Sequence, residues 1–280
     1  MPIPTSQLIT TIESTAIRMP TRPGEWERLE LPGIEANIST KITGAMVNNV
    51  GLTTLTEANT DAVIQRVIDI YRERDRPFQW WIGPNTKPHD LIERLKAAGA
   101  ELFMTADGLA TTDMHPDIPV NPNVRVEEVT DDTLDLASQI YARGFDFDNT
   151  HLRFDVARLW FETIQYAPPE FFGHNYVAYV DGIDEPIAAA CLTQVPGERI
   201  AHLAGGSAPP EYRGKGAYRA LLKRRFKDAA ADGAEAMIVQ CDRTTSSPIC
   251  QKIGMKKLCD LELYLFETPD APHRGEPNLG

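Results

Sequence analysis

Residues 208–220 of this chain read Ala208-Pro209-Pro210-Glu211-Tyr212-Arg213-Gly214-Lys215-Gly216-Ala217-Tyr218-Arg219-Ala220. A strand-like run that ends at Leu203-Ala204-Gly205-Gly206 precedes them. A helical pattern follows, because apolar residues recur at three- and four-residue spacing: Tyr218, Leu221, Leu222, Phe226 and Ala229. The stretch therefore predicts a strand that breaks at a proline pair, turns through two glycines and continues as a helix.

The turn has the chemistry of an anion-binding loop. Gly214 and Gly216 allow the backbone N–H groups to turn inward, because no Cβ stands in the way. Unpaired N–H groups at a helix N-terminus, with the helix dipole behind them, favour phosphate or pyrophosphate. The loop and helix also carry a local basic cluster in an acidic chain, which suits a polyphosphate ligand: Lys215, Arg219, Lys223, Arg224, Arg225 and Lys227. A turn with a purely structural role is the alternative.

The spacing argues against two common nucleotide-binding loops. The phosphate-binding loop of nucleotide hydrolases has its glycines farther apart and a Ser or Thr directly after its lysine, and neither feature occurs here. The dinucleotide-binding fingerprint needs a third glycine at position 219, which is Arg219. Nucleotide binding is therefore the weakest of the alternatives for this loop.

The stretch resembles the coenzyme A pyrophosphate loop of the GNAT acyltransferase superfamily, whose pattern is Arg/Gln-x-x-Gly-x-Gly/Ala. Arg213-Gly214-Lys215-Gly216 fits its first four positions, with Tyr218 where Gly or Ala is usual. Two residues earlier, Gly214 and Gly216 fit the pattern, but Glu211 replaces the Arg or Gln.

The predicted elements after the loop continue the resemblance. A strand over 235–241, a short helix over 247–253 that ends at Gly254, and a strand over 255–266 follow the loop helix. This order is that of the GNAT core, and the resemblance covers residues 124–266. It implies an α/β fold with a central, mostly antiparallel sheet flanked by helices.

The first half of the chain repeats the same order of predicted elements. A strand over 45–52 leads to helix 56–74, strand 78–82, helix 87–98 closed by Gly99, and a hairpin of strands 101–104 and 109–113 around Asp107-Gly108. The loop before helix 56–74 has no glycine or basic residue, and Glu57 would repel a phosphate. The first half therefore resembles the degenerate N-terminal domains of tandem GNAT proteins. It either helps to wall the acceptor pocket or only supports the second half.

Three prolines in the polar run 113–122 indicate a stiff linker between the two halves. We expect a degenerate GNAT-like domain over residues 1–115, a GNAT acyltransferase domain over 123–267 and a disordered tail over 268–280. The remaining predicted elements are helices over 6–19, 131–143 and 154–164, and strands over 26–29, 34–38, 124–129, 176–180 and 186–194.

Composition limits the partners and the location. The 280-residue chain has a formal net charge of −12, which excludes a general nucleic-acid or acidic-membrane footprint. We find no signal peptide and no apolar run long enough for a membrane span, so we expect a cytoplasmic protein. The four cysteines match no close-paired zinc pattern, and we expect no metal. The sequence leaves a homodimer open.

The family resemblance implies direct transfer of an acyl group from the thioester of acetyl-CoA to an amine, without a covalent enzyme intermediate. It implies that backbone N–H groups of strand 203–207 polarise the thioester carbonyl. The residues expected to bind the coenzyme are Leu203, Ala204, Gly205, Arg213, Gly214, Lys215, Gly216, Ala217, Tyr218 and Arg243, the last in place of a frequent Asn.

Two side chains are candidate catalysts. His202 lies on the strand before the loop, near the family's frequent base position, and its ordinary pKa suits neutral pH; a structural strand histidine is the alternative. Cys250 occupies the position of a Tyr that often protonates the departing thiolate, and a thiol is a weaker donor than a phenol.

Three further side chains are candidates for binding the acceptor. Asp146, Asp148 and His151 lie in a loop that shapes the acceptor site in this family, and together they suggest a cationic amine. An ordinary solvated loop is the alternative.

The leading hypothesis is thus an acetyl-CoA-dependent N-acyltransferase whose acceptor is a small-molecule or peptide amine. The second is a non-catalytic acyl-CoA-binding sensor or partner-binding protein on the same fold, which the cysteine at position 250 favours.

Overall fold

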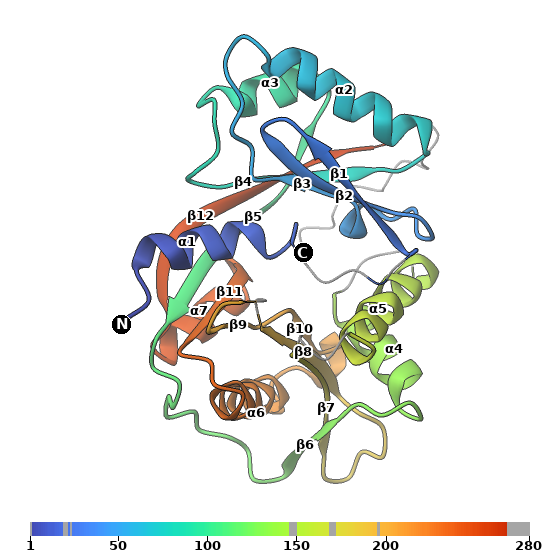
Figure 1. The fold of residues 1–280 in the computed structure, drawn as a ribbon. Helices are drawn as coiled ribbons and strands as arrows, with labels where there is room; N and C mark the ends of the chain where they lie inside the picture. The colour runs from blue at the N-terminus through green and yellow to red at the C-terminus, as the bar shows by residue number, and fades with distance from the viewer. Residues whose placement is uncertain are drawn as a thin grey trace.

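The computed structural model describes residues 2–18, 22, 24–145, 150–167, 172–194 and 197–267, without the side chains of 150–153. Within these ranges twelve strands form one sheet, in the order β1-β2-β3-β4-β12-β5-β11-β9-β8-β7-β6, with β10 paired to β8 (Figure 1). The predicted α/β class with a mostly antiparallel sheet is confirmed. Only the pairs β3–β4 and β9–β11 are parallel among the strands described.

The helices are α1 (Thr5–Ser14), α2 (Thr60–Glu73), α3 (Leu91–Ala97), α4 (Leu134–Gly144), α5 (Thr150–Gln165), α6 (Ala217–Ala231) and α7 (Ser246–Lys252), with the 3-10 turns η1 (Ala45–Val47) and η2 (Pro210–Tyr212). The strands are β1 (Trp26–Leu31), β2 (Ile34–Ser39), β3 (Asn49–Gly51), β4 (Phe78–Ile82), β5 (Glu101–Thr111), β6 (Val124–Glu128), β7 (Gly173–Val180), β8 (Ala188–Gln194), β9 (Ile200–His202), β10 (Gly206–Ser207), β11 (Ala236–Asp242) and β12 (Lys256–Phe266).

The repeated order of elements is confirmed. The series β3, α2, β4, α3, β5 in the first half matches β10, α6, β11, α7, β12 in the second. Gly99 and Gly254 follow the short helices at equivalent places, and both have a positive φ, 98° and 96°. A left-handed residue after a helix is most often glycine, because other residues are strained there.

The two halves exchange their last strands. Strand β12 of the second half lies between β4 and β5 of the first, and β5 lies between β11 and β12 (Figure 1). Tyr264 and Phe266 of β12 are therefore part of the same buried cluster as Tyr71, Phe78 and Trp80 of the first half. One sheet thus contains strands from both halves of the chain. The division into domains at 115–123 stays a prediction.

Helices cover both faces of the sheet in the second half. Residues of β8 alternate between two buried clusters: Ala188, Ala190 and Leu192 face α6, and Ala189 and Cys191 face α4 and α5. This alternation follows from the two-residue period of a strand. It places α6 and the α4–α5 pair on opposite faces, with β8 and β10 between them (Figure 1).

The predicted hairpin at Asp107-Gly108 is wrong, because β5 runs through both residues without a turn. Asp107 is buried, and its carboxylate accepts hydrogen bonds from Ser247 (2.7 Å) and Arg243 (3.0 Å) and pairs with Lys257 (2.9 Å). A Cβ at position 108 would lie 2.4 Å from the Cys259 sulfur. Two residues typical of turns are thus required here by packing and by charge.

Other predicted boundaries also move, and the expected helix 6–19 ends at Ser14. The expected strand 45–52 is η1 followed by the short strand β3. The expected helix 56–74 begins at Thr60, because the Asn59 side chain accepts hydrogen bonds from the N–H and the hydroxyl of Thr56 in a preceding turn. Helix 87–98 begins only at Leu91. The predicted tail 268–280 lies outside the described residues.

The strand exchange predicts that neither half folds alone. Residues 1–120 lack β12, and residues 121–280 lack β5, so each fragment would expose unpaired strand edges in its core. We expect the fragments to show no cooperative thermal transition separately, but to give one, at the temperature of the intact chain, when they are co-expressed. Circular dichroism of purified fragments measures this, and a cooperative transition in either isolated fragment would contradict it.

Candidate functional site

Strands β9 and β11 part in the middle of the sheet. They pair in parallel from Ile200 to His202, and the Leu203 N–H still donates to the carbonyl of Ile238 (3.0 Å). The chain then turns away, and β10 pairs with β8 instead. The end of β11 therefore lacks a partner on this side among the described strands, at the point where the sequence predicted the site of the thioester.

The turn is a tight kink at Leu203–Gly206. The Gly205 N–H donates back to the carbonyl of Leu203 (2.8 Å), and Gly205 has a φ of +100°. A Cβ there would lie 2.0 Å from the Tyr141 hydroxyl, so only glycine fits this position. The Ala204 N–H donates to no backbone or side-chain group that the structure describes. The kink therefore presents a free donor beside the parted strands.

A buried cation supports the kink from α6. Arg225 is 1% exposed, and its Nη1 donates to the carbonyls of Gly205 (2.9 Å) and Cys191 (3.2 Å). Its Nη2 has no hydrogen-bond partner in the described structure, and no carboxylate there pairs with it. Unpaired charges are costly to bury. The guanidinium thus places a positive charge, without a counter-charge, beneath the kink.

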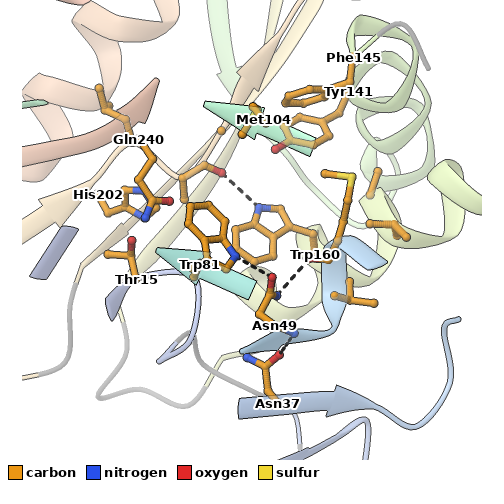
Figure 2. Close-up of a pocket in the computed structure, with 18 of the residues that line it drawn as sticks. Thr15, Asn37, Asn49, Trp81, Met104, Tyr141, Phe145, Trp160, His202 and Gln240 are labelled. Atoms are coloured by element: carbon orange, nitrogen blue, oxygen red, sulfur yellow. Dashed lines mark hydrogen bonds between the residues drawn. The ribbon is translucent and has the colours of Figure 1, made fainter. Parts of the chain in front are cut away.

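His202 ends β9 directly before the kink. Its imidazole faces a cavity and hydrogen-bonds to no residue that the structure describes (Figure 2). Burial, with a further contribution from the positive charge of Arg225, lowers the pKa of His202 to about 4. The ring is therefore neutral at pH 7 and has both nitrogens available.

The cavity has a volume of about 230 Å³ and lies between the two halves of the chain (Figure 2). Its lining is mostly apolar and aromatic: Thr15, Ala16, Trp26, Asn37, Met46, Val47, Asn49, Trp81 and Met104 from the first half, and Tyr141, Ala142, Phe145, Val156, Ala157, Trp160, His202, Leu203, Ala204, Gly205 and Gln240 from the second. This set of described residues contains no Asp, Glu, Lys or Arg. The first half therefore does form part of the cavity wall.

The polar groups of the wall mostly bond to each other. Trp81 Nε1 donates to Asn49 Oδ1 (2.9 Å), and Trp160 Nε1 donates to the carbonyl of Ala204 (3.3 Å). Gln240 Nε2 donates to the carbonyl of Ile12 (2.6 Å). These bonds leave ring faces toward the cavity, and the Trp160 bond also fixes the kink from the side opposite Arg225.

The glycine loop forms a row of backbone N–H donors in front of α6. Gly214 and Gly216 have φ values of +79° and +92°, and Gly216 caps the helix. The N–H groups of Gly214, Lys215 and Gly216 have no acceptor in the described structure, and no side chain caps α6. Asn121 Nδ2 holds the loop by donating to the carbonyl of Lys215 (3.0 Å). The predicted residues 213–218 therefore lie together at one helix N-terminus.

The predicted basic cluster divides into three groups. Lys215, Arg219, Lys223 and Lys227 are exposed and form no ion pair with a described residue. Arg224 pairs with Asp228 (2.6 Å) and Glu128 (3.6 Å), and Arg225 is the buried cation described above. Arg213 donates to the carbonyls of Ala208 and Gly144 (both 3.3 Å). Within this cluster, among the residues described, Lys215 and Arg219 are thus the free cations close to the loop.

Cys250 lies in α7, fully buried, with its sulfur 4.0 Å from the Tyr218 hydroxyl. The neighbouring Cys241 thiol donates to the Cys250 sulfur, which raises the pKa of Cys241 and lowers that of Cys250. Burial raises the pKa of Tyr218 well above its usual value. The structure thus places Tyr218, which was expected to bind the coenzyme, beside Cys250, which was expected to protonate the departing thiolate.

The remaining predicted site residues either lie away from the kink and the glycine loop or are not described. Arg243 donates to Asp107 (3.0 Å) and to Asp260, and so joins the ion cluster around β5 and β12. Asp146 and Asp148 lie outside the described residues, and the side chain of His151 in α5 is not described. No group of metal-ligating side chains occurs in the described part of the chain, and no helix in it is long and apolar enough to cross a membrane.

The residues of the first half that line the cavity were not predicted individually. Trp80 and Trp81 are consecutive in β4; Trp80 is fully buried in the first-half core, while Trp81 faces the cavity (Figure 2). Their opposite directions follow from strand alternation. A tryptophan pair in a strand is therefore the one sequence signal that could have pointed to a second apolar surface.

The low pKa of His202 predicts a pH-dependent stability. Between about pH 6.5 and pH 4 the unfolded chain takes up a proton at His202 that the folded chain does not, so the free energy of unfolding falls as the pH falls through this window. A shift from 6.5 to about 4 corresponds to roughly 3 kcal/mol. Urea unfolding of wild type and His202→Gln at pH 7 and pH 4.5 should show wild type losing stability relative to the variant. A constant difference would contradict a buried, neutral His202.

Comparisons with known proteins agree with the fold. The Acetyltransferase (GNAT) family model matches residues 134–254, and no curated protein matches the chain. A GCN5-related N-acetyltransferase from Kribbella flavida superposes with a TM-score of 0.63 at 14% identity, over 85% of this chain and 88% of that one. A tandem GNAT protein from the clavulanic acid biosynthesis pathway superposes with a TM-score of 0.62 at 11% identity, over 93% and 92%.

The match over 134–254 coincides with the helices and strands that hold the kink, the glycine loop and His202. The superpositions cover 85% and 93% of this chain, which is more than either half alone. Residues 134–254 thus match the GNAT acetyltransferase family, and the fold of the chain is similar to that of a tandem GNAT protein.

Proposed function

We propose that this chain is an acetyl-CoA-dependent N-acyltransferase that transfers an acetyl group to an amine bound in the cavity. One observation carries the proposal: the unpaired Ala204 N–H stands where β9 and β11 part, with His202 and the cavity beside it. The glycine loop follows β10 directly, so a donor row for a pyrophosphate and a donor for a thioester carbonyl lie on one continuous stretch, 203–216.

The residues present fit coenzyme A. The free N–H groups of Gly214, Lys215 and Gly216 would hold the pyrophosphate, and the exposed Lys215 and Arg219 would balance its charge. When bound, the coenzyme supplies an activated acetyl thioester. The Ala204 N–H would donate to the thioester carbonyl as negative charge develops there, and the charge of Arg225 beneath the kink favours the same change.

The neutral imidazole of His202 would accept the proton that the amine loses on attack. The Tyr218–Cys250 pair would donate a proton to the departing thiolate, since the two groups lie 4.0 Å apart, with Cys250 fully buried and Tyr218 partly buried. Two observations favour the alternative of a non-catalytic acyl-CoA-binding protein: an imidazole whose pKa is about 4 is a weak base, and Cys250 replaces the tyrosine expected from the family resemblance.

The glycine loop can be tested with two matched variants. Gly214 and Gly233 have φ values of +79° and +85°, and a Cβ at either would meet no atom within 4 Å. Gly214→Val and Gly233→Val should therefore cost similar stability, by backbone strain of about 1–3 kcal/mol. We expect Gly214→Val to weaken acetyl-CoA binding at least tenfold in calorimetry and Gly233→Val to leave it unchanged. Equal affinities in the two variants would remove the loop from the coenzyme site.

The catalytic role of His202 separates the two functions. If the chain is an enzyme, His202→Gln should lower kcat for acetyl transfer about 100-fold and leave the affinity for acetyl-CoA unchanged, because Gln keeps a polar group but cannot accept the proton. Release of free thiol from acetyl-CoA over a panel of amines measures this. If wild type gives no release above hydrolysis with any amine while acetyl-CoA still binds, the non-catalytic function is correct.

A further inference from the structure

We propose that the acceptor is a weakly basic amine, of the arylamine type, which enters the cavity uncharged and places a bulky apolar body between the two halves. This inference rests on the proposed function, because it names the acceptor of the same site. It departs from the cationic acceptor that Asp146, Asp148 and His151 suggested.

The walls of the cavity suit an aromatic body. Three of the four tryptophans of the chain line it, Trp26 and Trp81 from the first half and Trp160 from the second. The indole N–H groups of all three donate to protein acceptors, Trp26 to the carbonyl of Val47 (3.1 Å). Only the apolar ring faces and edges thus remain for a ligand, and such surfaces bind aromatic rings well.

The polar groups left for a ligand lie around the kink. His202 and the Tyr141 hydroxyl have no hydrogen-bond partner in the described structure, and both contact or precede the kink that carries the free Ala204 N–H. Figure 2 shows the labelled His202 and Gln240 on the opposite side of the cavity from Trp160 and Phe145. An amine would therefore be oriented toward His202, with its apolar part directed to the tryptophans.

The charges around the cavity disfavour an ammonium ion. No carboxylate lines it among the residues described, and the buried cation Arg225 holds the kink that forms part of its wall, with Nη2 unpaired. Removing an ammonium from water without a counter-ion is costly, and a nearby cation adds to that cost. The same two causes hold His202 neutral, so they would also favour the neutral form of the acceptor.

The cavity itself provides the measurement, because its tryptophans report occupancy by fluorescence whether or not acetyl transfer occurs. The full chain would be titrated at pH 7.5 with 4-isopropylaniline, which is uncharged, and with 4-isopropylcyclohexylamine, which has the same heavy-atom skeleton but is an ammonium ion. We expect the aniline to bind at least tenfold more tightly. Equal binding, tighter binding of the ammonium, or no saturable binding of either amine would overturn the proposal.

Two variants test whether charge in the cavity causes the preference. Met46 lines the cavity and is 44% exposed, so Met46→Glu adds a carboxylate there without filling the core. Leu102 is similarly exposed (52%) but lies outside the lining, so Leu102→Glu is the matched control. We expect Met46→Glu to bind the ammonium at least tenfold more tightly than wild type does, and Leu102→Glu to match wild type. Similar effects of both variants would contradict a local charge effect.

Acetyl transfer is measured in parallel, so that the two proposals can fail separately. Preferential binding of the aniline without transfer from acetyl-CoA would leave the acceptor site in place and overturn the enzyme function. Efficient transfer to the cyclohexylamine, with poor transfer to the aniline, would confirm an acyltransferase and overturn the acceptor class in favour of the cationic acceptor.

Discussion

The hydrogen bonds from Arg225 to the carbonyls of Gly205 and Cys191 hold the kink on which the rest of the site depends. A backbone that leaves its sheet pairing exposes polar groups, and a buried donor is needed to satisfy the carbonyls that turn inward. The Arg225 guanidinium donates to these carbonyls from α6, and the Trp160 indole donates to the Ala204 carbonyl from the cavity side. Because the kink is fixed, the Ala204 N–H, His202 and the start of the glycine loop keep a constant relation to one another.

The charge of Arg225 has a second effect. It is buried without a carboxylate partner in the described structure. Its charge adds to the larger effect of burial in lowering the pKa of His202, and it disfavours any other cation nearby. The residue that supports the kink therefore also sets the electrostatics of the cavity: a neutral base, a favoured oxyanion and a disfavoured ammonium. The exchange of β5 and β12 adds the missing wall, because it fixes Trp26, Asn49 and Trp81 of the first half opposite the kink.

The sequence contained enough local information for the order of elements. The glycine loop, the helix periodicity after Tyr218 and the glycines at 99 and 254 predicted the two repeated units, and the structure confirms that order. Each of these signals arises within a few residues of the chain. Tertiary contacts over long sequence separations were not accessible in this way, and the β5–β12 exchange and the cavity between the halves both depend on them.

Single residues misled the sequence interpretation for the same reason. Asp107-Gly108 has the composition of a turn, yet a buried ion cluster and the Cys259 sulfur require both residues inside a strand. Arg224 and Arg225 belong to a basic run by sequence, but one faces carboxylates and the other faces backbone carbonyls, because a helix directs successive side chains about 100° apart. The placement of Tyr218 beside Cys250 likewise depends on how α6 packs against α7.

Amide hydrogen exchange with and without saturating acetyl-CoA would test most directly whether the kink and the glycine loop form one coenzyme site. The N–H groups of Ala204 and of Gly214, Lys215 and Gly216 have no acceptor in the described structure, so they should exchange rapidly in the free chain. Acetyl-CoA should slow exchange in both segments together, while the equally exposed turn at Gly233 stays unchanged. Protection of neither segment, or of the loop without the kink, would contradict a thioester site at Ala204.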